Sequence, residues 1–372
     1  MSERANRPPR RSPSQAPKRL RAAIIGCGKI SRPHARAYRE VEATELVAAA
    51  DISQPAREAF AAELGLERVY ADAAEMLSKE KPDIVSVCTW PPHHADLTVA
   101  ACQAGVRAVL CEKPIAVHLA DADRMIEAAR ASGTLLCVNH QRRFTPRYLA
   151  AREYIDAGAI GLVRHVTGIC GGDLLTDGTH LIDLTRYLLG DLPIEWVFGG
   201  LERTKRQKVD AVRGMGFAEW YTTGKRYGHH VEGGTLALLQ FQGGVRANLE
   251  IGNLARPAYQ KFVVEGADGR VEISGDRWPP GEPELRLLQA HGGLTVPKLG
   301  PNRAMAANVE AIVDALESGA THTLRADSAR ATLEAIMAIY QSALDRRRVD
   351  LPFERPDSPF EAAVESGAFT YS

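Results

Sequence analysis

The stretch 22-AAIIGCGKISRPHARA-37 decides the fold, because it predicts a buried strand, a tight glycine turn and the start of a helix. Gly26 suits the sharp turn, and Gly28 lets the main chain approach a ligand closely. The start of the helix presents free N–H groups and the positive end of the helix dipole, which favour a pyrophosphate. Ser31 stands where the third glycine of a G-x-G-x-x-G pattern is usual. An ordinary strand-to-helix turn is the alternative interpretation.

An acidic residue at the end of the next predicted strand favours a dinucleotide site. Asp51 follows the apolar strand Leu46–Ala50 and lies about 20 residues beyond Gly28. A carboxylate at this spacing is expected to hydrogen-bond the adenosine ribose, and its charge repels a 2′-phosphate. We therefore expect NAD as the cofactor, with NADP as the alternative. Arg57 is expected to lie too far along the next helix to hold the extra phosphate of NADP.

The composition is that of an ordinary two-domain globular protein. The chain has 372 residues with 46 basic and 46 acidic side chains, so it has no net charge that would attract nucleic acid. No apolar run reaches the roughly 18 residues that span a bilayer. The six cysteines form no C-x-x-C pair, which favours reduced thiols in a cytoplasmic protein. Residues 1–20, rich in Arg, Pro and Ser, are expected to form a disordered tail without an export signal.

Apolar strand-like segments alternate with helical segments through residues 21–141. This alternation predicts a doubly wound parallel sheet that binds ligands beyond the carboxyl ends of its strands. The expected strands are Leu20–Ile25, Leu46–Ala50, Arg68–Tyr70, Ile84–Thr89, Ala108–Cys111 and Leu135–Val138. The expected helices are His34–Val41, Pro55–Leu64, Ala73–Ser78, Ala95–Ala104 and Ala120–Ala131.

Polar residues follow two of these strands at the expected ligand edge. They are the run 89-TWPPHH-94 and the triplet 112-EKP-114. Lys113 is expected to face the crevice, where its amine could take a proton from a substrate hydroxyl while hydride leaves the same carbon. An ion pair with Glu112, or simple exposure, is the alternative for Lys113. The adjacent pair His93–His94 lacks a third ligand, so no metal is expected.

The ordered motifs resemble the Gfo/Idh/MocA oxidoreductase family, which includes glucose–fructose oxidoreductase and inositol 2-dehydrogenase. The resemblance runs from about Arg21 to Pro352. It implies an NAD(P)-dependent dehydrogenase that acts on a hydroxyl-bearing carbon of a sugar, sugar acid or cyclitol. It also implies a second α/β domain, residues 142–372, with a large, mostly antiparallel open sheet. The matching segments are GCGKISRPH, Ala48–Ile52, SVCTWPPHHADLTVAACQAGVRAVLCEKPIA, VNHQRRFTPRYLAAREYIDAGAIG, DGTHLIDLTRYLLG and AIYQSALDRRRVDLP.

The sequence after residue 142 agrees with such a second domain. Strands rich in β-branched or aromatic residues are separated by glycine turns, and two amphipathic helices follow them. The expected helices are Tyr148–Ala157, His180–Leu189, Ala304–Glu317 and Ala326–Asp345. The expected strands are Leu162–Cys170, Ile194–Glu202, Thr235–Gln242, Val245–Ile251, Phe262–Glu265 and Val271–Ser274.

The resemblance makes Lys113 and His180, the histidine of D-G-T-H, catalytic residues. The family has an aspartate four residues before this histidine, but Thr176 stands there and Asp177 follows it. A shift of one residue rotates a helical side chain by about 100°. Asp177 could therefore be catalytic or the N-cap of the helix beginning near Gly178, and Thr176 could bind substrate. Asp183 could orient the histidine or only place charge in the first helical turn.

The complete predicted site has a cofactor side and a substrate side. The cofactor-binding residues are Gly26, Gly28, Lys29, Ile30, Asp51, Thr89, Trp90, Pro91, His94, Glu112 and Lys113. The substrate-binding residues are Lys113, Arg143, Thr176, Asp177 and His180, with Arg142 as a weaker candidate beside the family-like Arg143.

Three questions stay open at this stage. The same fold could serve a glycosidase that uses bound NAD transiently, or a nucleotide-binding protein without catalysis. An exposed apolar face of the second sheet predicts a homo-oligomer, either a dimer or a tetramer. Residues 204–234 could line the substrate pocket, pack as a loop or form a subunit interface; they hold Trp220, Tyr221, Tyr227, His229 and His230.

Overall fold

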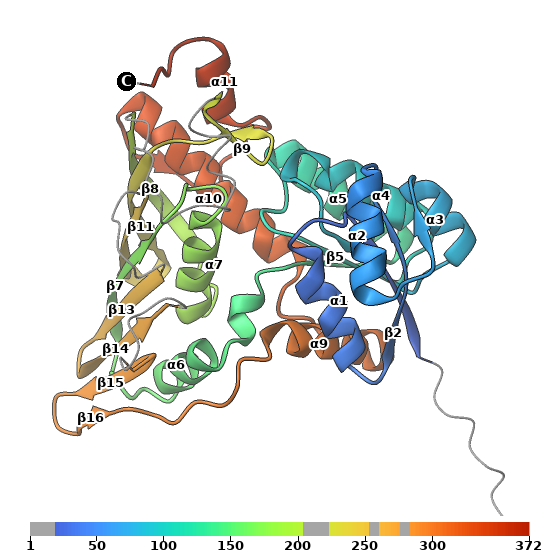
Figure 1. Cartoon of the computed structure of the whole chain (residues 1–372). Coiled ribbons are helices and arrows are strands. Elements are labelled where there is room, and N and C mark those ends of the chain that lie inside the picture. The colour runs from blue at the N-terminus through green and yellow to red at the C-terminus, as the bar shows by residue number, and fades with distance from the viewer. Residues whose placement is uncertain (1–18, 204–222, 253–259, 276–282, 372) are drawn as a thin grey trace, which may run out of the picture.

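The computed structural model describes residues 19–203, 223–252, 260–275 and 283–371. It contains a six-stranded parallel sheet and a nine-stranded mixed sheet, with helices between them (Figure 1). Most of the predicted tail, residues 1–18, lies outside the described residues, as do Trp220 and Tyr221. The predicted combination of a parallel sheet with a larger, mostly antiparallel one is confirmed.

The first sheet has the strand order β3-β2-β1-β4-β5-β6, with every neighbouring pair parallel. Its central strands are buried throughout because helices cover both faces. The strands are β1 (Leu20–Ile25), β2 (Thr44–Ala50), β3 (Val69–Tyr70), β4 (Ile84–Val87), β5 (Ala108–Cys111) and β6 (Leu135–Val138). The helices are α1 (Ser31–Glu40), α2 (Gln54–Leu64), α3 (Ala73–Glu80), α4 (His94–Gln103) and α5 (Leu119–Ser132).

Element boundaries differ from the prediction by a few residues. Helix α1 begins at Ser31 instead of His34, because Ile30 already has helical φ/ψ and the helix leaves the glycine turn directly. Strand β4 ends at Val87 rather than at Thr89. Gly65 and Gly133 end α2 and α5 in the left-handed conformation that favours glycine.

The second sheet has the order β16-β15-β14-β13-β7-β12-β11-β8-β17. Its neighbours pair antiparallel except β7 and β12, which are parallel. Three of its strands, β15, β16 and β17, were not predicted. The strands are β7 (Val163–Cys170), β8 (Ile194–Glu202), β11 (Gly234–Phe241), β12 (Arg246–Ile251), β13 (Gln260–Gly266), β14 (Gly269–Ser274), β15 (Leu285–Gln289), β16 (Gly293–Thr295) and β17 (Val349–Asp350).

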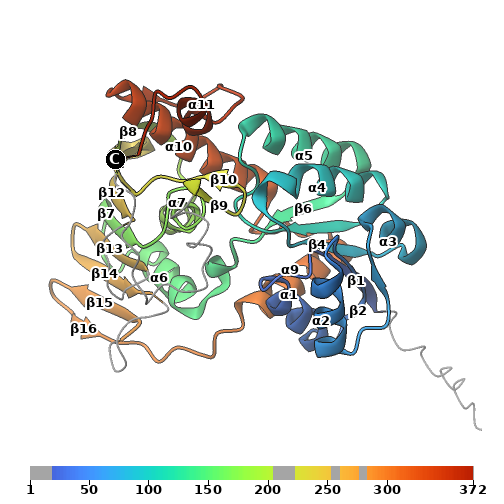
Figure 2. The same ribbon diagram turned by 45° about the horizontal axis from the view of Figure 1, so that its top comes forward.

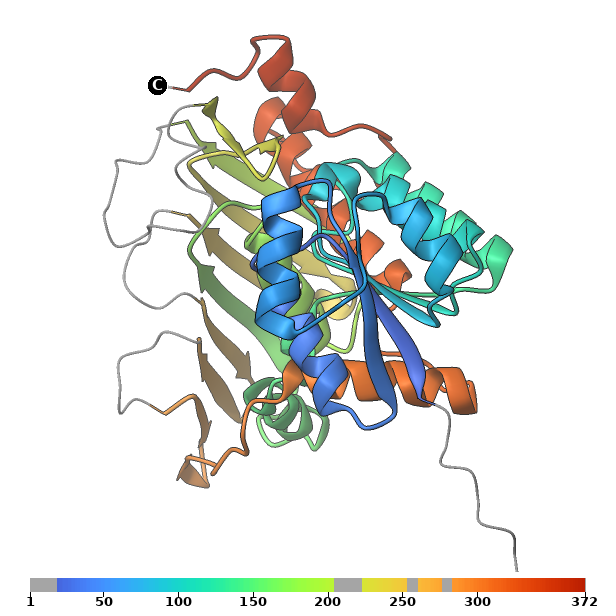
Figure 3. The same cartoon turned by 45° about the vertical axis from the view of Figure 1, so that its right-hand side comes forward.

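Helices α6 (Pro146–Asp156), α7 (Gly178–Leu188) and α10 (Ala326–Asp345) cover the face of this sheet that is turned toward the first sheet (Figures 1 and 3). They contribute to one continuous apolar core with side chains from both sheets. Among the described residues, no helix covers the opposite face in these views. The layer of helices between the sheets is therefore shared by the two halves of the molecule.

Helix α9 (Ala304–Ser318) returns from the second half of the chain to the first sheet. It packs against α1, and its Ala306, Val309 and Ile312 belong to the apolar core that includes Ile24 of β1. The division of the chain into residues 21–141 and 142–372 stays a prediction, and α9 is the element that crosses it.

A short hairpin, β9 (Lys225–Arg226) and β10 (His229–His230), lies over α7 and reaches toward the first sheet (Figure 2). At its tip, the ring of Tyr227 lies 6.3 Å from that of Trp90, which follows β4. The C-terminal segment holds its base. His230 Nδ1 lies 2.5 Å from Glu361 Oε2 in α11 (Pro359–Glu365), and the Tyr371 hydroxyl donates to Val231 O at 2.8 Å.

Candidate active site

The glycine turn after β1 fits the predicted nucleotide loop. Gly26 has φ +97°, and a Cβ there would lie 2.7 Å from the main-chain oxygen of Cys88, so no other residue fits without displacement. A Cβ added at Gly28 would meet no atom within 4 Å, which leaves space for a ligand against the main chain. The Asp51 carboxylate lies beside this turn and accepts hydrogen bonds from Cys27 N at 2.7 Å and Ser53 N at 2.8 Å.

A cavity of about 380 Å³ opens beside this carboxylate at the carboxyl ends of β1, β2 and β4. The hydroxyl of Thr89 borders the cavity and has no hydrogen-bond partner among the described residues. Mostly apolar walls, the Asp51 carboxylate at the end of β2 and an unpaired buried hydroxyl suit the adenosine half of a dinucleotide. The lining residues are Ile25, Gly26, Ala50, Asp51, Ile52, Ala71, Asp72, Ala73, Thr89, His93, Asp96 and Leu97.

Arg57 lies closer to this site than the sequence suggested. Its Nη1 donates to the main-chain oxygen of Asp51 at 2.6 Å, so the guanidinium reaches the end of β2 from the first turn of α2. The expectation that Arg57 does not hold the extra phosphate of NADP stays a prediction. Lys29 and Ile30 are exposed in the loop, where a ligand could contact them.

Two predicted cofactor ligands instead support the strand ends. The Glu112 carboxylate is buried and accepts from Asn139 Nδ2 at 2.6 Å, with His34 Nε2 at 2.8 Å. Burial raises the Glu112 pKa, but the contacts with His34 and Asn139 and the charge of Lys113 together outweigh it, and the pKa is lowered. His94 is also buried, with its ring nitrogens 2.9 Å from Pro114 O and 3.1 Å from Thr89 O. His94 thus joins the loops after β4 and β5, whereas Glu112 joins the end of β5 to the end of β6 and to α1, and neither side chain lines the cavity.

Lys113 bridges the two halves of the molecule at the end of β5. Its Nζ donates to the main-chain oxygen of Thr176 at 2.9 Å, just before α7. Burial lowers the pKa of Lys113, while the charges of Asp177 and Glu112 oppose this shift. An amine with a lowered pKa is neutral in a larger fraction of molecules, and only the neutral form accepts a proton.

His180 lies in the first turn of α7 and faces the same region. Its ring packs edge-on against His140, with 5.6 Å between ring centroids, and its buried Nδ1 has no hydrogen-bond partner in the described structure. Burial, followed by the charges of Arg142 and Lys113, lowers its pKa well below the usual histidine range. His180 is therefore neutral at pH 7, so that one ring nitrogen can donate a hydrogen bond and the other can accept one.

The structure places Asp177 at the predicted N-cap position of α7, and its catalytic role stays a prediction. Its side chain makes no capping hydrogen bond. Its Oδ2 instead lies 2.5 Å from Arg226 Nη1 of the hairpin. Thr176 is buried, and its Oγ1 lies 3.2 Å from His229 Nε2. Sequence reasoning missed Arg226 and left His229 unplaced, because neither lies in a motif and only the hairpin brings them here.

Arg143 does not point into the catalytic region. Its Nε and Nη2 lie 2.9 and 2.8 Å from the two Asp183 oxygens, and its Nη1 lies 2.8 Å from Asp191. The guanidinium is thus committed to two carboxylates, so we do not retain Arg143 as a substrate ligand. Arg142 lies nearer to the site: its guanidinium donates a hydrogen bond to Gln260, and its charge contributes to the lowered pKa of His180.

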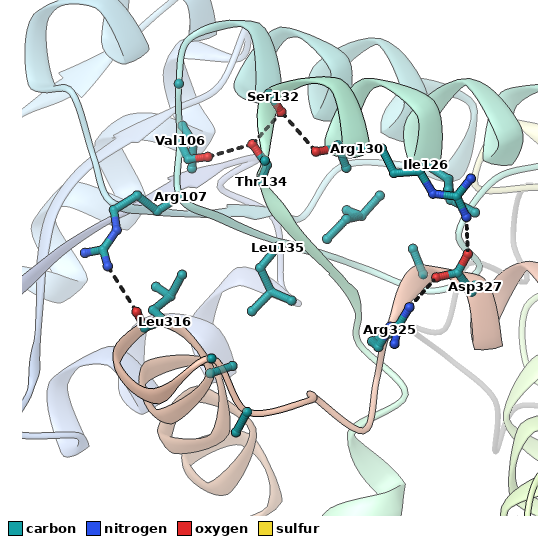
Figure 4. Close-up of a pocket in the computed structure, with 18 residues that line it drawn as sticks. Val106, Arg107, Ile126, Arg130, Ser132, Thr134, Leu135, Leu316, Arg325 and Asp327 are labelled. Carbon is teal, nitrogen blue, oxygen red and sulfur yellow. Dashed lines mark hydrogen bonds and ion pairs between the residues drawn. The ribbon is translucent and has the colours of Figure 1, made fainter.

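A second cavity, of about 650 Å³, lies at the opposite edge of the first sheet (Figure 4). It opens between the amino ends of β5 and β6 and the end of α9. Its polar groups pair with one another: Arg130 and Arg325 both contact Asp327 at 3.1 Å. Because ligands of doubly wound sheets bind at the carboxyl edge, this cavity is not the candidate active site.

Comparisons with known proteins agree with this geometry. Residues 20–140 match the family described as "Oxidoreductase family, NAD-binding Rossmann fold", and residues 168–277 match the "GFO/IDH/MocA C-terminal domain". The chain is 29% identical to a D-apiose dehydrogenase of Paraburkholderia graminis, over 94% of this chain and 95% of that protein. It is 31% identical to inositol 2-dehydrogenase 3 of Saccharopolyspora erythraea, over 68% and 73%.

Solved structures share the fold. A levoglucosan dehydrogenase in complex with NADH superposes with a TM-score of 0.78 at 19% identity, covering 91% of this chain and 100% of that one. Within the described ranges, helices are too short or too polar to cross a bilayer.

Proposed function

Because the chain belongs to the Gfo/Idh/MocA oxidoreductase family, we propose that it oxidises a secondary hydroxyl of a monosaccharide, sugar acid or cyclitol with NAD as hydride acceptor. The observation that carries this proposal is the meeting of Lys113 and the segment before His180 at the carboxyl edge of an NAD-binding Rossmann sheet. Relatives named D-apiose dehydrogenase and inositol 2-dehydrogenase support a polyhydroxylated substrate.

The residues present fit a dinucleotide. The free space at Gly28, the Asp51 carboxylate and the unpaired Thr89 hydroxyl would hold the pyrophosphate, the ribose and a further polar group of NAD. Bound NAD supplies an acceptor for the hydride that leaves the substrate carbon. The Asp51 carboxylate favours NAD over NADP, because its charge would repel a 2′-phosphate.

In the proposed mechanism, Lys113 and His180 divide the handling of the substrate hydroxyl. The neutral Lys113 amine takes the hydroxyl proton as the C–H bond breaks and the C=O bond forms. Neutral His180 hydrogen-bonds the same oxygen and orients the carbon. Burial of both groups supports these roles, because exclusion of water strengthens each interaction. Glu112 and His94 keep the lysine-bearing loop in place.

The direct test is nucleotide reduction, followed by NADH absorbance, with purified protein and a panel of sugars, sugar acids and inositols. We expect turnover with NAD on at least one polyol and weaker turnover with NADP. Release of a glycosidic leaving group without net NADH would instead identify a glycosidase. NADH binding without any turnover would contradict catalysis.

We also propose that the protein is a homo-oligomer in a reducing compartment such as the cytoplasm. Phe198 and Leu236 lie on the helix-free face of the second sheet, with 46% and 62% of their surfaces exposed. Apolar side chains on a broad sheet face favour cover by a second copy. All six cysteines are unpaired and buried, which supports a reducing environment. Sedimentation analysis of the wild type and of Leu236→Lys tests the oligomer.

A further inference from the structure

A buried arginine of the β9–β10 hairpin bridges two carboxylates beside Lys113. Arg226 Nη1 lies 2.6 Å from Asp173 Oδ2 and 2.5 Å from Asp177 Oδ2. The three residues are no more than 4% exposed. Removing one member of such a group leaves a buried charge without compensation, so the three side chains act as one unit.

This unit is tied to the residue that holds the lysine. Asp173 Oδ1 accepts from Thr176 N at 2.7 Å, while Thr176 O accepts from Lys113 Nζ at 2.9 Å. Arg226 therefore fixes the Asp173 carboxylate, and this carboxylate fixes the main chain at Thr176 through its N–H. The carbonyl oxygen of Thr176 in turn positions the amine of Lys113. The hairpin itself is fixed on its other side by the contact between His230 and Glu361.

The same arrangement sets the charge around the amine. Burial has the largest effect on the pKa of Lys113 and lowers it. The charges of Asp177 and Glu112 raise this pKa, and the charges of Arg226 and Arg142 lower it. His140 and His180 also interact electrostatically with this lysine. Arg226 is thus the cation that directly offsets Asp177, the carboxylate with the largest opposing effect.

We propose that Arg226 is a positioning residue of the dehydrogenase: it fixes the 173–177 segment and neutralises Asp177, so that Lys113 meets the substrate hydroxyl as a neutral amine. This inference rests on the proposed role of Lys113. It also gives a role to the acid that stands one residue after Thr176, the position where the family usually has an aspartate. Asp177 is paired with Arg226, and this pairing reduces the effect of its charge on the lysine.

The test measures the titration of Lys113 in two ways. The first is the pH profile of kcat/KM for NAD-dependent oxidation. The second is the pH dependence of trace acetylation of Lys113 by acetic anhydride, read by peptide mass spectrometry, which needs no turnover. Arg226→Met should move both midpoints upward by about one pH unit, because Asp177 loses its cation. Asp177→Asn should move them downward, and the double variant should lie near the wild type.

Matched variants separate charge from packing. Arg226→Lys retains the charge, so its midpoints should stay near the wild type while kcat falls. Arg21→Met removes a partly buried arginine that pairs with Glu80 at 2.9 Å, at the opposite edge of the first sheet, and should leave both midpoints in place. If Arg226→Met does not fold, the isosteric Asp177→Asn variant decides alone.

Midpoints that stay unchanged in folded Arg226→Met or in Asp177→Asn overturn the inference, because a purely structural role lowers kcat at every pH. The acetylation measurement also separates this inference from the proposed function. A shift in acetylation in a protein without dehydrogenase turnover contradicts the proposed function alone and supports the electrostatic role of Arg226.

Discussion

Replacing Arg143 by methionine should destabilise the protein without weakening substrate binding. Arg143 and Asp183 are 2% and 1% exposed, and the guanidinium contacts both Asp183 oxygens within 2.9 Å. Breaking such a pair leaves a buried carboxylate unpaired, which costs about 3–5 kcal/mol. The second partner, Asp191, has a side chain that is 40% exposed and can be rehydrated, so it adds little.

The assay combines thermal unfolding with steady-state kinetics. For domains of this size, a loss of 3–5 kcal/mol corresponds to a fall in Tm on the order of 10 °C. Burial raises the pKa of Asp183, but Arg143, together with the charges of His140 and Arg186, lowers it below its usual value. The stabilisation is therefore present at neutral pH and is lost as the pH falls into the acid range. The control Arg143→Met/Asp183→Asn, which removes both charges, should recover part of the Tm.

The opposite pattern would refute this reasoning. If Arg143→Met raised KM by about tenfold or more, equivalent to about 1.4 kcal/mol, with an unchanged Tm, then the arginine would be a substrate ligand as the family resemblance first suggested. The buried ion pair would then be worth little to the fold.

Three further predictions concern the nucleotide loop, the base and a buried acid. Lys113→Met should abolish turnover but retain NADH binding in a fluorescence titration; retained turnover would contradict its role as the base. Gly28→Ala should weaken NADH binding by about tenfold with an unchanged Tm, whereas Gly26→Ala should lower the Tm because its Cβ meets Cys88 O. Burial raises the Glu232 pKa to about 7, so stability should fall as pH rises from about 4.5 to 7. Glu232→Gln should flatten this dependence of the unfolding free energy on pH, measured by urea titrations at several pH values. An unchanged dependence would show that Glu232 is not the group that titrates.

The fold was predictable because its signals are local. The glycine turn, the apolar strands and the order of the motifs each lie within short stretches, and the six-stranded sheet follows from them. Strands β16 and β17 were missed because they are the two edge strands and are only three and two residues long, too short to show an alternating pattern. Strand β15 does alternate, with Leu285 and Leu287 buried, and the prediction overlooked this signal. Boundary errors such as that of α1 reflect turn geometry, which composition does not encode.

The candidate site was predictable only where a single motif contains it. Lys113 and His180 each lie in such a motif. In the structure, the loop that carries Lys113 contacts the segment that precedes His180. Glu112, His94 and Arg143 lie in the same motifs, but their polar atoms face other protein groups, and the sequence does not tell a ligand-facing side chain from a supporting one. Arg226 is about 50 residues from Asp173 in sequence, and only tertiary packing joins them.

The path of α9 limits how this molecule can be divided or recombined. A fragment containing only the contiguous nucleotide-binding segment would leave the surface of α1 without Val309 and Ile312, and we expect it to aggregate when expressed alone. Exchange of that segment between relatives would place a foreign α1 against a native α9. Chimaeras intended to transfer cofactor preference should therefore carry residues 304–318 together with the first sheet, since the two have to match as one packed surface.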